Sequence, residues 1–176
     1  MAMSMNFRDD LTKSCETAAE FLRKKLINIR RSTKEEIYSG EREFICEVYR
    51  LLVNKNKSYR NTLFVDYIPD RKGKEKKLPD LVFSDGSGNK SVVEMKVVVD
   101  KRKKGDLRLW AQDKKTVRHD YNKLKKNYKD FKSKFLVVAY LCDPKYEDET
   151  EFPIEDFKKA ICTSFPNTKK IRVIVC

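Results

Sequence analysis

Two carboxylates and a lysine stand in this chain at a spacing that could hold a metal ion. Asp80 follows Pro79 where one apolar segment begins, and Glu94 and Lys96 interrupt the next apolar segment, residues 90–99. Residues two apart on an extended strand project from the same face, so we expect Glu94 and Lys96 to lie side by side. Because a buried strand tolerates charges poorly, two opposite charges inside an apolar one indicate a chemical role.

This set of side chains suits metal-assisted hydrolysis of a phosphodiester. A turn at residues 85–88 makes a hairpin that brings Asp80 toward Glu94. Two carboxylates held close form a hard oxygen site for Mg²⁺, for which Mn²⁺ can substitute. Lys96 beside them can orient or help to deprotonate a metal-activated water, or stabilise developing negative charge. The structural alternative is a salt bridge between Lys96 and either Asp80 or Glu94.

The periodicity of apolar residues predicts the elements that position these side chains. Helical spacing is found over residues 7–30, 40–52, 117–131 and 154–165. Segments rich in β-formers are found over residues 62–68, 78–84, 90–99, 135–141 and 170–175. The early strands, joined by short connections, are expected to run antiparallel, and the later ones to run parallel through right-handed crossovers. The sequence therefore predicts an α/β fold with a mixed central sheet flanked by helices.

Length and composition are those of one globular domain. The chain has 176 residues, of which 40% are hydrophobic, enough for a single core. Within this domain, 1–176, we expect an accessory N-terminal helix over 7–30, a core over 36–142, and a C-terminal helix and strand over 143–176. No apolar run approaches the roughly 20 residues that a membrane span needs, and the N-terminus lacks the apolar stretch of a signal peptide. No membrane partner is expected.

The five cysteines favour a reducing compartment. They are odd in number and widely spaced, with no C-x-x-C pair, which argues against a zinc cage and against a disulfide framework. Cys46, Cys142 and Cys162 lie inside apolar runs and are expected to be small core hydrophobes. These observations predict a cytoplasmic protein.

The motif and the order of elements together resemble the PD-(D/E)xK nuclease superfamily, which has the restriction-endonuclease-like fold. The matching residues are Pro79, Asp80, Glu94 and Lys96, and the resemblance extends to an αβββαβ core over residues 36–142. It implies a phosphodiesterase, either an endonuclease or an exonuclease, in which Asp80 and Glu94 bind one or two divalent ions and Lys96 is catalytic. It also implies a nucleic acid substrate, DNA more often than RNA.

Members of this superfamily often add an acidic residue from the first core helix, for which Glu41, Glu43 and Glu47 are candidates. At about 100° per residue, Glu41 shares the inward stripe with Phe44 and Val48. Glu43 points nearly opposite, and Glu47 lies on the flank. Glu41 is therefore the expected additional metal ligand and catalytic residue. Its alternative role is that of a charge that favours the helix macrodipole.

An excess of positive charge predicts a polyanionic partner. Lysine and arginine number 40 against 27 acidic residues, which gives a net charge of +13, and residues 101–134 alone carry +10. Such a block binds phosphates without reading sequence, although a solvated helix face is the alternative. The residues expected to contact nucleic acid are Lys101, Arg102, Lys103, Lys104, Lys114 and Arg118.

Two functions remain open from the sequence. The first is a Mg²⁺-dependent nuclease that acts on DNA in preference to RNA; a homodimer is compatible with it, because cutting both strands of a duplex usually takes two sites. The second is a catalytically inactive nucleic-acid-binding protein of the same fold. The intact set of Asp80, Glu94 and Lys96 favours the nuclease, because a protein that only binds has no reason to bury these charges together.

Overall fold

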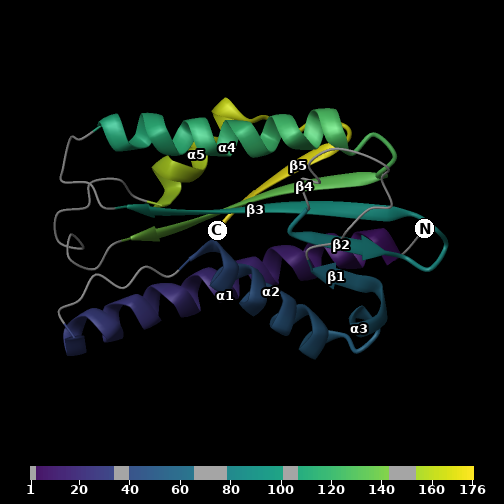
Figure 1. The fold of residues 1–176 in the computed structure, drawn as a ribbon, viewed down its shortest axis with the longest axis horizontal. Coiled ribbons are helices and arrows are strands. Elements are labelled where there is room, and N and C mark those ends of the chain that lie inside the picture. Colours follow the sequence, from purple (N-terminus) through teal and green to yellow (C-terminus); the bar gives the residue numbers. More distant parts are fainter. Residues whose placement is uncertain (1–2, 34–39, 66–78, 101–106, 143–153) are drawn as a thin grey trace, which may run out of the picture.

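The fold has three layers, with a five-stranded sheet between two layers of helices (Figure 1). The structure, a computed structural model, describes residues 3–33, 40–65, 79–100, 107–142 and 154–176. The helices are α1 (Met3–Thr33), α2 (Glu41–Lys55), α3 (Tyr59–Thr62), α4 (Leu107–Asn127) and α5 (Ile154–Ser164). The strands are β1 (Leu63–Val65), β2 (Leu81–Ser84), β3 (Lys90–Asp100), β4 (Ser133–Cys142) and β5 (Ile171–Val175). Figure 1 shows α4 and α5 on one face of the sheet and α1 and α2 on the other.

The sheet is mixed, which confirms the prediction from the sequence. Its strands lie in the order β1-β2-β3-β4-β5; β1, β2 and β3 pair antiparallel, and β3, β4 and β5 pair parallel. The antiparallel pair β2–β3 follows from a tight turn in which Gly86 and Gly88 have positive φ angles of 72° and 87°, a conformation that favours glycine. The Asp85 carboxylate closes this turn by accepting hydrogen bonds from the backbone N–H groups of Ser87 and Asn89.

Three local features differ from the sequence prediction. Helix α4 spans Leu107–Asn127, whereas the apolar spacing predicts a helix over residues 117–131. A one-turn helix, α3, precedes β1 in a polar segment for which the sequence predicts no helix. This helix forms around Tyr59, which is buried. Strand β1 ends at Val65 in the part of the chain that the structure describes, and residues 66–68 of the predicted strand lie outside it.

The two faces of β3 pack against different helices, which explains why its sequence is apolar at both parities. Val93, Met95 and Val97 lie in one core with side chains of α1 and α2. Val92 and Val98 lie in the other core, with side chains of α4 and α5. A central strand covered on both faces cannot alternate between apolar and polar residues, so each charge that it carries stands in a packed layer.

The N-terminal helix is part of the main core, and not an appendage to it. Phe7 is 1% exposed and stacks on Phe83 of β2 with 4.3 Å between ring centroids. It also meets Phe135 edge to face at 5.8 Å. Further along α1, Arg23 donates two hydrogen bonds, of 3.0 and 2.8 Å, to the carbonyl of Tyr140 in β4. These contacts tie both halves of α1 to the sheet.

The cysteines are placed differently from the prediction. Cys46 and Cys162 are exposed, so the prediction that they fill the core is wrong. Both stand on amphipathic helices whose apolar stripe passes beside them, and a run of apolar letters does not show on which side of a helix each residue falls. The buried cysteines are Cys15 and Cys176, while the side chain of Cys142 lies outside the described part of the chain.

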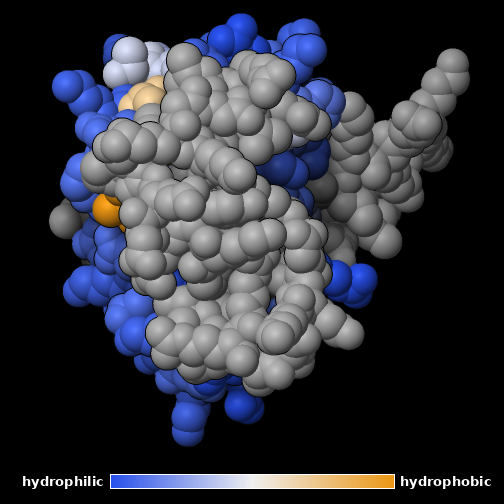
Figure 2. Space-filling view, turned by 90° about the vertical axis from the view of Figure 1, so that its left-hand side faces the viewer, coloured by the Kyte–Doolittle hydropathy of each residue, from blue (hydrophilic) through white to orange (hydrophobic). Residues whose placement is uncertain are grey.

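At the end of the molecule that Figure 2 faces, the described residues in view are mostly hydrophilic. Within the described ranges, no helix combines the length and the apolarity that crossing a bilayer requires.

Truncating Phe7 tests whether α1 belongs to the core. We expect Phe7→Ala to lower the free energy of unfolding by roughly 3–5 kcal/mol, because a fully buried ring leaves a cavity against the sheet. Phe21 of the same helix is 49% exposed, so Phe21→Ala is the matched control and should change stability by about 0.5 kcal/mol or less. Urea unfolding followed by circular dichroism measures both; equal effects of the two variants would contradict the packing described here.

Candidate functional site

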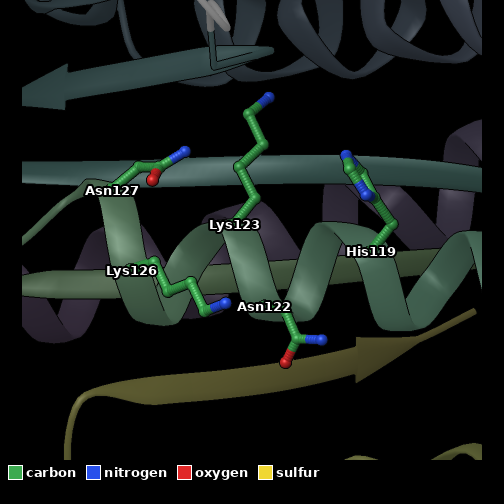
Figure 3. Close-up of a pocket in the computed structure, with 5 residues that line it drawn as sticks. All are labelled: His119, Asn122, Lys123, Lys126 and Asn127. Atoms are coloured by element: carbon green, nitrogen blue, oxygen red, sulfur yellow. The ribbon is translucent and has the colours of Figure 1, made fainter.

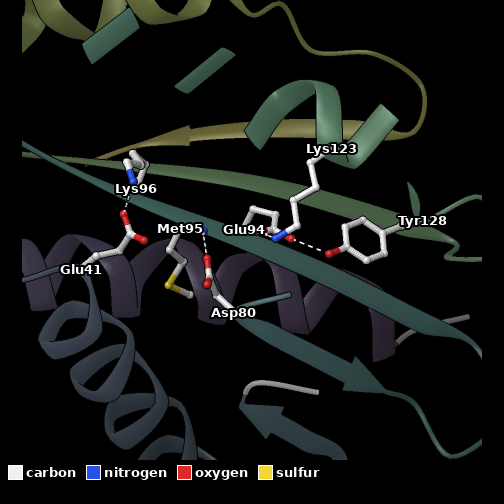
Figure 4. A network of polar contacts seen from close by, with 7 residues as sticks. All are labelled: Glu41, Asp80, Glu94, Met95, Lys96, Lys123 and Tyr128. Atoms are coloured by element: carbon white, nitrogen blue, oxygen red, sulfur yellow. Dashed lines mark hydrogen bonds and ion pairs between the residues drawn. The ribbon is translucent and has the colours of Figure 1, made fainter. Parts of the chain in front are cut away.

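The site forms where β3 extends beyond β2. The β2–β3 ladder ends at Leu81↔Val93, whereas β3 remains paired with β4 to its last residue. Asp80 directly precedes β2 at this point, and its Oδ2 accepts a hydrogen bond of 2.6 Å from the backbone N–H of Met95. The carboxylate thereby supplies an acceptor where the neighbouring strand has ended. Asp80 is thus held against the strand that carries Glu94 (Figure 4).

Glu94 lies on the face of β3 that α4 covers, and its carboxylate is enclosed. Glu94 is 2% exposed. Its Oε1 accepts a hydrogen bond of 2.8 Å from the hydroxyl of Tyr128, and its Oε2 pairs with Nζ of Lys123 at 2.8 Å. A buried carboxylate requires such partners, since an unpaired charge in a packed layer is very costly. Both partners come from the α4 region, so that helix and the central strand are joined through Glu94.

Lys96 pairs with Glu41, the first residue of α2, at 2.6 Å between Nζ and Oε2. The sequence offers as a structural alternative a salt bridge of Lys96 to Asp80 or Glu94, whereas the ion pair described for Lys96 is with Glu41. Of the three acidic candidates on α2, Glu41 is the one that reaches the predicted site. Glu43 pairs with Lys25 of α1, and Glu47 pairs with Arg50 one turn along its own helix.

The carboxylates that gather beside the uncovered stretch of β3 destabilise one another's ionised forms. Burial raises the pKa of Asp80 to about 6, and the negative charges of Glu41 and Asp120 add to the effect. Burial and the charge of Asp80 raise the pKa of Glu94 to about 7, against the opposing effect of Lys123 and Tyr128. Burial also raises the pKa of Asp120, although Lys96 is close enough to oppose it. Each ionised carboxylate thus disfavours ionisation of the next.

The donor set fits a hard divalent cation. All candidate ligands are carboxylate oxygens, which Mg²⁺, Mn²⁺ and Ca²⁺ prefer, and the mutual repulsion of Asp80 and Glu94 is what a cation would relieve. In the described part of the chain, however, no three acidic, histidine or cysteine side chains stand close enough together to hold a metal ion. The carboxylates instead have partners within the protein, so metal ligation by Asp80, Glu94 and Glu41 stays a prediction.

Three contributors to this site were missed by sequence reasoning: Asp120, Lys123 and Tyr128. Tyr128 carries a signal that could have revealed it, because a tyrosine in a buried stripe needs a partner for its hydroxyl. Lys123 and Asp120 look like solvated residues of a charged helix, and only the packing of α4 on β3 brings them to the strand.

The predicted nucleic-acid contacts are only partly described. Lys114 is half-buried and Arg118 is exposed, both on α4. Residues 101–104, which supply the other four predicted contacts, lie outside the described residues.

Comparisons with known proteins add no assignment: no family model, curated protein or solved structure matches this chain. The fold and the site define an α/β protein with carboxylates and lysines gathered at one edge of the central strand of a mixed sheet.

Neutralising Asp80 should make the protein more stable at alkaline pH. The pKa of Asp80 is raised to about 6 in the folded state, against about 3.9 in an unfolded chain. Between these values the folded state binds more protons, so stability falls as the pH rises. We expect the free energy of unfolding of Asp80→Asn to exceed that of wild type by roughly 1–3 kcal/mol near pH 8. Between about pH 4 and 7, the stability of the variant should decrease less with rising pH than that of wild type. Urea unfolding without divalent ions measures both effects.

Asp130→Asn is the control for this experiment, since Asp130 is exposed; it should follow the wild-type profile. An Asp80→Asn protein that is less stable than wild type at alkaline pH would show that the Asp80 carboxylate is a net stabilising group and that the electrostatic description is wrong.

Proposed function

We propose that this chain is a metal-dependent nuclease of the PD-(D/E)xK type, which hydrolyses phosphodiester bonds in DNA in preference to RNA. The observation that carries the proposal is that Asp80, which directly precedes β2, is hydrogen-bonded to the short stretch of β3 that carries Glu94 and Lys96. The order from α2 to β4, with the one-turn α3 set aside, is the αβββαβ order of the restriction-endonuclease-like core, which supports the same proposal.

Asp80 and Glu94 would hold the divalent cation, with Glu41 as a further ligand. The raised pKa values of Asp80 and Glu94 support this assignment, because a cation would stabilise two charges that otherwise oppose each other. When bound, Mg²⁺ or Mn²⁺ would supply Lewis-acid polarisation of the phosphodiester and would favour ionisation of the attacking water.

Lys96 is the proposed catalytic cation. Its side chain is 26% exposed, so a phosphodiester at the edge of β3 has access to it. A fixed ammonium group there stabilises the negative charge that develops on the phosphoryl oxygens during attack. The ion pair with Glu41 fixes the position of this ammonium group next to the first residue of α2. Tyr128 acts as a positioning residue, because its hydroxyl fixes the orientation of the Glu94 carboxylate. Lys123 neutralises the other oxygen of this carboxylate in the free protein.

The positive charge of the chain supports nucleic acid as the substrate. Lys114 and Arg118 on α4, together with the basic residues 101–104, would bind phosphates along the substrate. A homodimer would place two sites on a duplex. The free cysteines of the described residues are compatible with the proposed cytoplasmic location.

The second candidate function is nucleic-acid binding without cleavage. It is favoured by one observation: Asp80, Glu94 and Glu41 are each engaged by a donor of the protein itself. If those contacts persisted when substrate is bound, the three carboxylates would stabilise the fold and would not bind a cation.

Replacing Lys96 separates the two functions. We expect Lys96→Met to retain Mn²⁺ binding in calorimetry, because no ligand is lost, and to retain most of its affinity for nucleic acid. Cleavage should fall about 100-fold or more, since the group acts on charge that develops in the transition state. The assay follows wild type and variant, purified identically, on single-stranded, duplex and branched DNA and on RNA, with Mg²⁺ or Mn²⁺.

Lys159→Met is the matched control, because Lys159 is an exposed lysine on α5 and its loss should leave cleavage unchanged. Equal cleavage by wild type and Lys96→Met would mean that the activity uses another site. No cleavage by wild type on any substrate would leave the binding function in its place.

A further inference from the structure

A polar pocket of about 270 Å³ lies on α4. Its described lining consists of His119, Asn122, Lys123, Lys126 and Asn127. These positions follow the 3–4 spacing of one helical face, and Figure 3 shows His119, Lys123 and Asn127 extending toward the same side of the helix. All lining residues in the described part of the chain therefore come from one helix.

The described lining of this pocket suits an anion that also carries hydrogen-bonding groups. Two ammonium groups supply positive charge, the imidazole of His119 adds a hydrogen-bonding group, and none of the described lining residues is acidic. Lysine is a common ligand for phosphate. Asn122 and Asn127 each offer a donor and an acceptor, the combination that pairs with the edge of a nucleobase. The volume suits one nucleotide rather than a segment of duplex.

Lys123 belongs both to this pocket and to the predicted cation site. It lines the pocket, and its Nζ lies 2.8 Å from Oε2 of Glu94. The side chain of Lys123 is 11% exposed, so the Glu94–Lys123 ion pair is largely shielded from solvent. An anion in the pocket and a cation beside Glu94 would each compete for one member of the same ion pair.

We propose that the α4 pocket is a subsite for one nucleotide of the substrate and that Lys123 couples its occupancy to cation binding. This inference rests on the proposed function for the identity of the cation site. A phosphate in the pocket draws the ammonium group of Lys123 from Glu94, which leaves the carboxylate available to a cation. A cation at Glu94 releases Lys123 to the phosphate in the same way. The coupling is reciprocal, as any linkage between two binding sites must be.

The consequence is that the cation site is weak until substrate arrives. In the free protein, Lys123 is the counter-ion of Glu94. When a nucleotide phosphate binds in the pocket, the ammonium group of Lys123 pairs with the phosphate instead. The substrate therefore completes the site that is to act on it. An unpaired strand or a frayed end suits this arrangement, because the pocket accepts a nucleotide only when its base edge is accessible.

The test uses deoxyadenosine 5′-monophosphate, which has no phosphodiester to cut, and Ca²⁺, both titrated into the full chain by calorimetry. The mononucleotide should bind in cation-free buffer, and Lys126→Met and Asn122→Ala should each weaken it several-fold. Inorganic phosphate should compete with it, and deoxyadenosine should bind more weakly. At saturating mononucleotide, the affinity for Ca²⁺ should rise by roughly 5-fold or more.

Lys123→Met isolates the coupling. We expect this variant to bind Ca²⁺ more tightly than wild type when no nucleotide is present, because the competing ammonium group is gone. Adding the mononucleotide should then change its Ca²⁺ affinity by about twofold at most. Lys159→Met should retain the wild-type coupling. If Lys123→Met folds poorly, the Lys126→Met and Asn122→Ala variants still test the pocket.

The outcomes distinguish this inference from the function on which it rests. Mononucleotide affinity that is unaffected by Lys126→Met and Asn122→Ala would overturn the pocket. Ca²⁺ and nucleotide that bind independently, or a coupling that survives Lys123→Met, would overturn the role of Lys123 and leave the nuclease proposal standing. An absence of Ca²⁺ binding under every condition, with nucleotide binding intact, would overturn the cation site and the coupling together and leave the pocket assigned.

Discussion

The buried carboxylate of Glu94 is the constraint on which this structure depends. A negative charge in the central strand of a sheet covered on both faces must be compensated inside the protein. Lys123 and Tyr128 provide the compensation from the α4 region, so α4 has to pack on β3 at one register for the strand to be tolerated. The same contact brings the polar face of α4 next to the edge of β3. A packing requirement thus assembles the residues of the candidate site.

The edge itself arises from unequal strand lengths. Strand β2 spans Leu81–Ser84 and β3 spans Lys90–Asp100, so most of β3 extends past its antiparallel neighbour while β4 still supports it. A backbone N–H at such a point needs a new acceptor, and the Asp80 carboxylate fills this role for Met95. The hydrogen bond fixes one oxygen of Asp80 and leaves the other to the site. A β2 that began several residues earlier in the chain would have covered this stretch with a ladder.

Much of the fold could be predicted from the sequence, because the order of helices and strands depends on the local spacing of apolar residues. The period of the apolar residues gives the order of elements and the mixed sheet, and the angle of Glu41 on its helix favours it over Glu43 and Glu47 as the residue that reaches the site. The rest depends on tertiary packing. Nothing in residues 107–127 distinguishes Lys123 from its exposed neighbours until α4 lies on β3. For the same reason, Cys46 looks like a core residue until the sides of α2 are assigned.

The lysines of the site have a double effect on the protein. Lys96 and Lys123 neutralise Glu41 and Glu94, which lets the chain fold around carboxylates that would otherwise repel one another. The same ion pairs compete with any divalent ion for those carboxylates, so stability without the ion is gained at the expense of affinity for it. Asp80 escapes this compromise, because its partner is a backbone N–H and not a charge. It is therefore the carboxylate best prepared to receive a cation first, with Glu94 joining once Lys123 has a different anion to bind.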